Sequence, residues 1–233
     1  MLMDVKRNLE RIMGRSGFEN PMVFYPELEL KIWEFCDTNL FLNCLMKQLK
    51  DAFLPRRPLQ KANVTLDPDT AYSRFILSQD WKSVTWGDKC QDLPNRPQRF
   101  DTCAFLLGCQ EFTSGRHFWE VSVVDEGAWN VGIARKSVRR KGPVGFGVKE
   151  GIWAVGKWDG RYWTTNHPHS PHLTLKKEPK RIRVSLNYEE GRVAFYDGDT
   201  RALLFTLSEA SFAGEPLLPF FYVNGTGCLR ISS

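Results

Sequence analysis

A histidine and a glutamate lie three positions apart in the stretch SGRHFWEVSVV, residues 114–124. His117 and Glu120 are residue types that enzymes use for general acid–base catalysis, which needs both side chains to converge on one substrate. The stretch also alternates like a β-strand, which places His117 and Trp119 on one face and Glu120 on the other. The alternation therefore predicts a strand without a catalytic pair, in which Glu120 contacts a cation or a neighbouring strand.

A second group of residues could hold a metal ion. His167, His169 and His172 lie within six residues, but Pro168 and Pro171 break any regular element there, and no cysteine or carboxylate lies among them. We therefore expect an extended loop without a metal. The six cysteines contain no CxxC pair, so reduced and mostly buried thiols are expected, without a zinc site or a disulfide framework.

Glycines cluster around Phe146, between residues 142 and 151. A phosphate-binding loop of this kind would lead into a helix, whereas a strand is expected to begin at Ile152. We interpret the segment as a flexible recognition loop. No GxSxG or HExxH motif occurs, and the adjacent Glu189 and Glu190 belong to a predicted turn, so intrinsic catalysis is not expected.

Basic residues form two runs, in a chain whose formal net charge is only +5. The runs comprise Arg135, Lys136, Arg139, Arg140 and Lys141, and then Lys176, Lys177, Lys180, Arg181 and Arg183. Together with Trp158, Tyr162 and Trp163 they could bind single-stranded RNA, because basic grooves and stacking aromatics are its usual receptors. Many of these residues alternate with apolar ones on predicted strands. RNA or a phosphorylated ligand therefore stands as the alternative to protein binding.

The elements that must position these residues change character near residue 58. Before it, Leu2, Val5, Leu9 and Ile12 have the spacing of a coiled-coil seam, and a second helical stripe begins near Glu27. We predict that residues 1–58 are the helical end of a coiled coil and a linker. No signal peptide or apolar membrane span is apparent, so a cytoplasmic location is expected, with a nuclear location as the alternative.

Beyond residue 58 the period of the apolar residues becomes two. Short segments rich in β-branched and aromatic residues are separated by Gly, Pro, Asn and Asp, which predicts a β-sandwich over residues 59–233. Strands at 181–186, 192–197 and 202–207 are expected to form an antiparallel meander, since tight turns separate them. No alternation of strands and helices is present, which argues against a nucleotide-binding parallel sheet.

Three motifs in this β region carry a family resemblance. Leu66-Asp67-Pro68, Trp119-Glu120-Val121 and Leu186-Asn187-Tyr188-Glu189 resemble the three signature motifs of the PRY/SPRY domain, and the likeness covers nearly all of residues 60–233. Asn187 stands where an aspartate is common, which raises a question about a local hydrogen bond or turn. The preceding helices resemble the linker of tripartite-motif ubiquitin ligases. The resemblance implies a mainly β fold, a bent antiparallel β-sandwich, preceded by the helical segment.

The resemblance also implies a function. The chain would be the protein- or peptide-recognition module that selects substrates for ubiquitination by a RING elsewhere in the longer protein. The chain itself would be neither an enzyme nor a cofactor protein, and zinc is expected only in the RING and B-box, which it lacks. A homodimer through the coiled coil is implied. Some butyrophilins bind phosphorylated metabolites in a basic pocket with a histidine after the strand tryptophan, but here Asn130 follows Trp129.

By position in the family's separated binding loops, seven residues are candidates for the binding surface. These residues are Cys103, Phe105, Trp129, Phe146, Trp158, Tyr222 and Asn224. Core packing is the competing interpretation for Phe105 and Trp129, which lie on predicted strands. Phe146 and Trp158 lie in or beside loops next to glycine or aspartate, so we expect both rings to be exposed.

Overall fold

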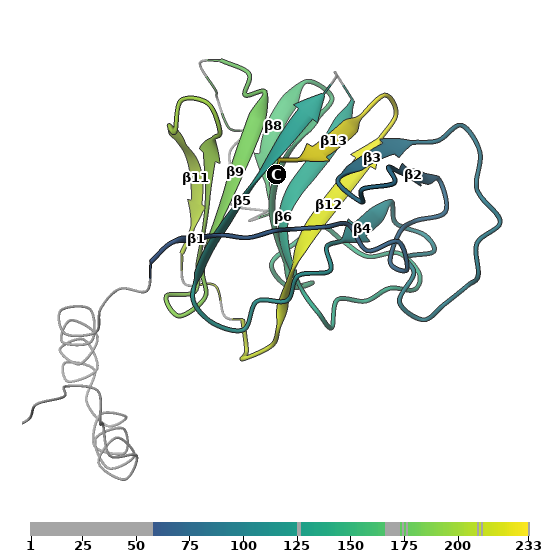
Figure 1. The fold of residues 1–233 in the computed structure, drawn as a ribbon, viewed down its shortest axis with the longest axis horizontal. Helices are drawn as coiled ribbons and strands as arrows, with labels where there is room; N and C mark the ends of the chain where they lie inside the picture. The colour runs from purple at the N-terminus through teal and green to yellow at the C-terminus, as the bar shows by residue number, and fades with distance from the viewer. Residues whose placement is uncertain are drawn as a thin grey trace, which may run out of the picture. The chain divides into compact units, whose positions relative to one another are not determined.

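A computed structural model describes residues 58–232, apart from 125–126, 166–172, 174, 176, 209 and 211. The predicted helical segment and the three-histidine cluster therefore lie outside the described residues. The described residues form 13 strands in two sheets and contain no helix, which confirms the mainly β prediction (Figure 1).

The larger sheet has eight strands and the smaller sheet has five. In the larger sheet the order is β11-β10-β9-β5-β13-β3-β2, with β1 beside β5; the strands are β1 (Gln60–Lys61), β2 (Phe75–Leu77), β3 (Ser83–Trp86), β5 (Arg116–Val124), β9 (Arg181–Asn187), β10 (Arg192–Asp197), β11 (Leu203–Leu207) and β13 (Cys228–Ile231). In the smaller sheet the order is β4-β12-β6-β7-β8; the strands are β4 (Phe105–Leu107), β6 (Ala128–Arg135), β7 (Ile152–Trp158), β8 (Arg161–Thr164) and β12 (Leu217–Asn224).

The predicted meander is confirmed. Strands β9, β10 and β11 pair antiparallel in chain order, with a register shift between Phe195 and Tyr196. Tight turns join them because glycine and short polar residues occupy the connections. The pairing of β1 with β5 is parallel, and it is the exception to the expected antiparallel arrangement among the described strands.

The main core lies between the two sheets and follows from the period-two pattern. Trp119, Trp153, Phe195 and Phe221 are almost completely buried there, and the Trp119 ring stacks on Phe112 with centroids 5.3 Å apart. On each strand, alternate residues point into this core, so the neighbouring residues point to the outer faces. The core thereby determines which side chains the outer faces present.

The smaller sheet is buried on its outer face as well. A second cluster there contains Phe100, Phe105, Phe220 and Tyr222, with Phe146 packed against it. The segments before β4 and before β7 supply part of this layer, which is why strands such as β12 are buried at nearly every position. The outer face of the smaller sheet is therefore an aromatic layer and not a solvated surface.

The third signature motif ends in a well-bonded turn. The Glu190 amide donates to Asn187 Oδ1 at 3.2 Å, and Gly191 closes the turn with a φ of 57°. Tyr188 donates its hydroxyl to the Glu215 carbonyl at 2.9 Å. An amide oxygen accepts the hydrogen bond that a carboxylate could accept, so asparagine at position 187 is compatible with the turn.

Candidate functional site

One residue from each strand of the smaller sheet contributes to a row across its outer face. From β4 to β8 the row reads Phe105, Tyr222, Asn130, Gly156 and Trp163. Residues that pair directly across antiparallel strands share a face, and Phe105 and Tyr222 belong to the outer cluster. The row is therefore a floor of aromatic rings with one amide and one glycine at its centre.

Phe146 covers this row. Its ring centroid lies 4.7 Å from Phe105, 5.2 Å from Tyr222 and 5.3 Å from Trp163, each in edge-to-face geometry. Such pairs contribute about 0.5–1.5 kcal/mol each beyond the area that they bury. The side chain is accordingly half-buried, whereas the sequence predicted an exposed ring, because three surrounding rings provide it with a packing site.

The glycine-rich segment that carries Phe146 is hydrogen-bonded near its beginning to the segment that precedes β4. The Gly142 amide donates to Asp101 Oδ1 at 2.9 Å, and the Val144 amide donates to Cys103 Sγ at 3.2 Å. The first of these hydrogen bonds lowers the pKa of Asp101 below its ordinary value. Cys103, half-buried before β4, thus anchors the segment, which was expected to be a flexible loop.

An exposed aromatic lies at the edge of the row. Trp158, the last residue of β7, is 51% exposed, and its ring stacks on Tyr222 with centroids 6.1 Å apart. Burial raises the pKa of the Tyr222 hydroxyl, although a side-chain hydrogen bond with Asn224 acts in the opposite direction, so the phenol is neutral at physiological pH. Trp158, Tyr222 and Asn224 together offer an apolar platform with hydrogen-bonding groups at its side.

Asn130 lies at the centre of the row with an unpaired amide. It is fully buried, and neither Oδ1 nor Nδ2 has a hydrogen-bond partner among the described residues. The amide packs against the backbone of β7, since a Cβ on Gly156 would lie 2.0 Å from Asn130 Oδ1. An unpaired buried amide costs about 1–3 kcal/mol, which the packing around Asn130 must offset.

Six of the seven predicted residues gather on this outer face, and Trp129 does not. Trp129 is 2% exposed in the core between the sheets, with its ring centroid 6.2 Å from that of Tyr162. The prediction did not place Asn130 on this outer face, although the strand period contained the signal. If Trp129 points inward, its neighbour Asn130 must point to the outer face.

The histidine and glutamate of β5 are confirmed as strand residues and do not converge. His117 Nε2 is hydrogen-bonded to the Ser114 carbonyl at 2.8 Å. Glu120 lies on the opposite face and accepts hydrogen bonds from Arg183 at 2.9 Å and from Arg201 at 2.6 Å. The expectation that Glu120 contacts cations is therefore confirmed.

The first basic run folds back onto the domain. The Arg140 guanidinium lies 4.8 Å from the centroid of the Phe100 ring, and burial lowers its pKa to about 10. Lys141 donates to Asn95 Oδ1, and Arg139 donates to the Lys141 carbonyl. Arg139, Arg140 and Lys141 of the first run therefore each contact another part of the domain or its backbone.

The described part of the chain also bears on two further classes of site, metal-binding clusters and membrane-spanning helices. It contains no group of three or more His, Cys, Asp or Glu residues placed to hold a metal ion. Nor does that part contain a helix with the length and apolar character that crossing a membrane requires.

Domain families match most of the described residues. Residues 64–112 match the SPRY-associated domain, PRY, and residues 116–232 match the SPRY domain. The structure resembles that of the TRIM65 PSpry domain, with a TM-score of 0.64 at 19% identity, covering 92% of this chain and 98% of that one. It also resembles stonustoxin, with a TM-score of 0.64 at 24% identity, covering 74% of this chain and 29% of that one. At these identities the likenesses show the fold.

Curated relatives extend the comparison. Zinc finger protein RFP of Homo sapiens is 36% identical over 97% of this chain and 46% of its own length, and E3 ubiquitin-protein ligase TRIM15 of Sus scrofa is 37% identical over 99% and 50%. Butyrophilin subfamily 1 member A1 of Bos taurus is 41% identical over 78% of this chain and 34% of its own length. The chain thus spans half or less of the length of these relatives. It belongs to the PRY/SPRY family, whose domains are protein-interaction modules, and its similarity to RFP and TRIM15 over nearly its whole length places it with the tripartite-motif members.

Proposed function

We propose that the outer face of the smaller sheet binds a segment of a target protein, with Trp158 as the central contact. The observation that carries this proposal is the half-exposed Trp158 ring stacked on buried Tyr222. Folding alone gains little from leaving a tryptophan exposed, whereas tryptophan is enriched among the residues that dominate protein interfaces.

The geometry indicates how a partner is held. An apolar side chain of the target packs against Trp158, which Tyr222 holds in place from behind. Asn224, half-buried at the end of β12, offers an amide to the target backbone beside this contact. One such anchor supplies about 2–4 kcal/mol, so a single domain binds a short peptide with modest affinity after the ordering costs.

In the longer protein, this binding selects substrates for ubiquitin transfer by a RING outside this chain. The similarity to TRIM15, which is named an E3 ubiquitin-protein ligase, supports this role. Zinc belongs to that RING and its B-box. A homodimer through the predicted coiled coil in residues 1–58 presents two binding faces, which raises effective affinity for a repeated target by about 10² to 10⁴. The expected location is the cytoplasm, with the nucleus as the alternative.

The test is selection of a displayed peptide library on the full chain and on two tryptophan variants. Trp158→Ala removes the proposed anchor, whereas Trp81→Ala removes another exposed tryptophan, 44% exposed before β3. Urea unfolding first establishes that both variants fold. Peptides selected on the wild type should keep their affinity for Trp81→Ala and lose about 30- to 700-fold for Trp158→Ala, the equivalent of 2–4 kcal/mol. Equal binding to Trp158→Ala and the wild type would contradict the proposal.

RNA or phospholigand binding through the basic loops is the other candidate. It predicts affinity that falls steeply with salt and with neutralisation of Arg139, Arg140 and Lys141. The contacts of these three residues with Phe100, Asn95 and the backbone favour protein binding instead.

A further inference from the structure

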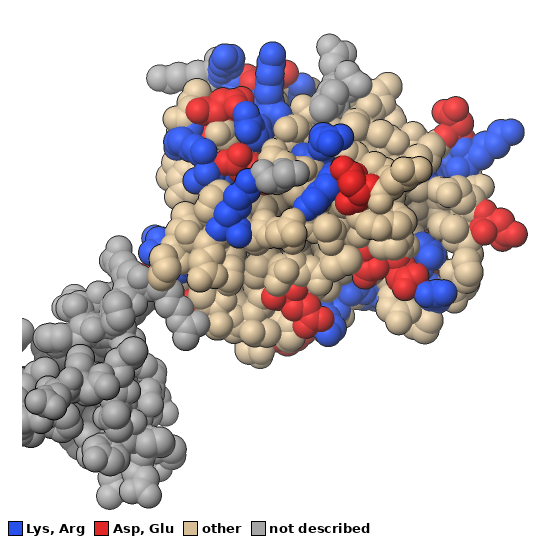
Figure 2. All heavy atoms as spheres, viewed as in Figure 1, with Lys and Arg blue, Asp and Glu red and all other residues tan. Residues whose placement is uncertain are grey.

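A groove on the outer face of the larger sheet lies across the sandwich from the proposed protein-binding face. Its volume is about 380 Å³, and its lining includes four arginines, Arg116, Arg183, Arg192 and Arg201. Figure 2 shows basic side chains gathered with acidic ones at the upper left, where Figure 1 places β9 and β11. The arginines come from β5, β9, β10 and the turn before β11, so the meander brings them together.

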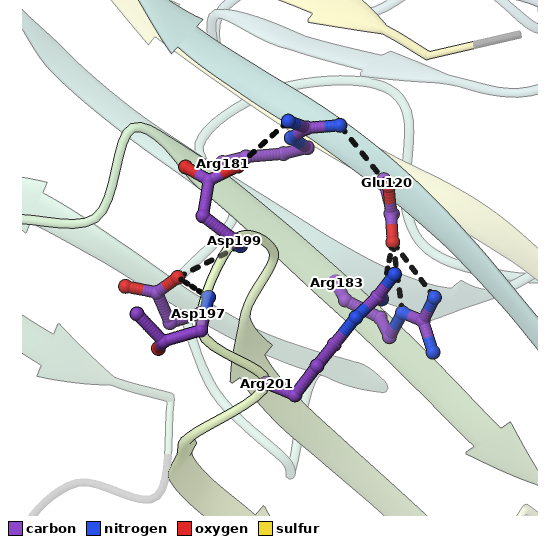
Figure 3. Close-up of polar contacts among 7 residues, drawn as sticks. Glu120, Arg181, Arg183, Asp197, Asp199 and Arg201 are labelled. Atoms are coloured by element: carbon purple, nitrogen blue, oxygen red, sulfur yellow. Dashed lines mark hydrogen bonds and ion pairs between the residues drawn. The ribbon is translucent and has the colours of Figure 1, made fainter.

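At one end of the groove, one carboxylate forms ion pairs with three guanidinium groups. Glu120, whose side chain is 9% exposed, lies 3.5 Å from Arg181, 2.8 Å from Arg183 and 2.6 Å from Arg201 (Figure 3). Arg181 has a second carboxylate partner in Asp199, which balances its charge. Arg183 and Arg201 are therefore oriented by one nearly buried carboxylate, which leaves an unbalanced positive charge.

Arg183 also packs against an aromatic ring. Its guanidinium lies 4.0 Å from the centroid of the Phe118 ring. A guanidinium held both by an aromatic ring and by a carboxylate loses little conformational freedom when its remaining N–H groups bind an anion. This end of the groove is thus organised before any ligand arrives.

At the other end a neutral residue separates two arginines. Arg116 of β5 and Arg192 of β10 both pair with Asn187 of β9, one on each side. Arg192 has Glu190 as its ion-pair partner at 2.9 Å, whereas Arg116 has no carboxylate partner among the described residues. Across the whole groove, four guanidiniums therefore meet two carboxylates, Glu120 and Glu190, which leaves an excess of two positive charges.

Between its two ends, the groove is lined by small side chains. Ser185 and Ala194 pair directly across β9 and β10 and both line the groove. These small side chains leave room above the sheet, and the Ser185 hydroxyl offers a hydrogen-bond donor. The floor, walls and charge together fit a compact anion with several acceptor oxygens.

We propose that this groove binds a phosphorylated serine, threonine or tyrosine side chain of a partner protein. A phosphate monoester carries nearly two negative charges at neutral pH, which matches the excess of two, and its oxygens accept the paired N–H groups that guanidinium offers. A ligand with a carboxylate in place of the phosphate carries one negative charge and would leave one of the two excess positive charges unbalanced. A groove of about 380 Å³ suits one side chain better than it suits an RNA backbone, which needs a continuous basic track.

Asn187→Asp tests the proposal with almost no change in shape. The new carboxylate lies between Arg116 and Arg192 and competes with the ligand for them. Arg116→Gln is the second variant, and it removes a cation without leaving a described carboxylate unpaired. Asn95→Asp adds the same charge beside Lys141, outside the groove lining, and is the matched control.

The probes are a degenerate phosphoserine peptide pool, the same pool unphosphorylated, the same pool with glutamate at that position, inorganic phosphate and oligouridine. On the full chain, the phosphorylated pool should bind at least about tenfold more tightly than the other probes. Both groove variants should lose at least about tenfold, while Asn95→Asp and Trp158→Ala keep the wild-type affinity. If Trp158→Ala binds the phosphorylated pool as tightly as the wild type does, the phosphate site is distinct from the proposed protein-binding face.

Three results would overturn the proposal. Equal binding of the phosphorylated and unphosphorylated pools would remove the role of phosphate. Unchanged binding in both groove variants would place any phosphate site elsewhere. Tighter binding of oligouridine, inorganic phosphate or the glutamate pool than of the phosphopeptides would assign the groove to a different anion.

Discussion

Replacement of Glu120 by glutamine tests whether the residue that resembled a catalytic acid is instead a structural counter-ion. Glu120→Gln keeps the shape of the side chain but removes the charge that orients Arg181, Arg183 and Arg201 (Figure 3). Catalysis is not at issue, because His117 lies on the other face of β5. The measurable consequence is a lower free energy of unfolding.

The size of this loss in the free energy of unfolding follows from the exposure of the three arginines. Arg183 is 19% exposed, so its charge-assisted hydrogen bond counts in full, about 1.5–3 kcal/mol. Arg181 and Arg201 are 39% and 53% exposed, and solvent reduces each of these contacts to about 0–1 kcal/mol. We expect Glu120→Gln to lower the free energy of unfolding by about 2–4 kcal/mol at neutral pH.

The difference in the free energy of unfolding between the wild type and Glu120→Gln should also become smaller as the pH falls. Burial raises the pKa of Glu120, but the hydrogen bonds from Arg183 and Arg201 outweigh it, so the pKa in the folded protein lies below the ordinary value of 4.5. A carboxylate with a lowered pKa stabilises the fold fully above the unfolded pKa and loses that contribution as the pH falls through the folded pKa. The gap between wild type and variant should therefore be constant from neutral pH down to 5 or so and narrow below 4.5.

The assay is urea unfolding of the full chain at several pH values. Glu111→Gln is the matched control, because Glu111 pairs with Lys136 on the surface and is 43% exposed, so that change should cost less than about 1 kcal/mol. A loss below about 0.5 kcal/mol in Glu120→Gln, or a gap that does not narrow in acid, would refute the counter-ion role.

Two further changes test the fold around the proposed sites. Gly132→Ala on β6 would place a Cβ 2.0 Å from the Trp153 carbonyl oxygen, so β6 and β7 must separate; we expect a loss above about 2 kcal/mol in urea unfolding, and a loss below about 0.5 kcal/mol would contradict the close approach. Asn187→Asp should change the free energy of unfolding by less than about 1 kcal/mol, because the carboxylate still accepts from the Glu190 amide and faces two arginines; a loss above about 2 kcal/mol would show that the turn requires the amide.

The local sequence pattern was sufficient to predict the strands. The alternation through His117 and Trp119 predicted β5 and its buried face, because side chains in any strand alternate regardless of what the strand pairs with. The turns at 189–192 and 197–200 predicted the meander for a similar reason, since a tight turn leaves the next strand no other neighbour. The three motifs then predicted the family, which the domain matches confirm.

The candidate site was only partly predictable. Phe146 lies in a glycine-rich segment, where the chain alone indicates mobility, and only the folded sheet supplies the three rings that bury it. Trp129 and Asn130 are neighbours with opposite roles. Which of them faces the core depends on where the second sheet lies, and that is not a property of the strand itself.

The sequence by itself determined that this protein is a PRY/SPRY β-sandwich with aromatic residues near its loops, because periodicity, turns and motifs are local. Only the tertiary structure decided which residues meet. Glu120 and Arg201 lie 81 positions apart, yet their pairing, like the row from Phe105 to Trp163, depends on the order and register of strands that are distant in the chain. Such register arises from packing the whole core at once, and no short stretch of sequence contains it.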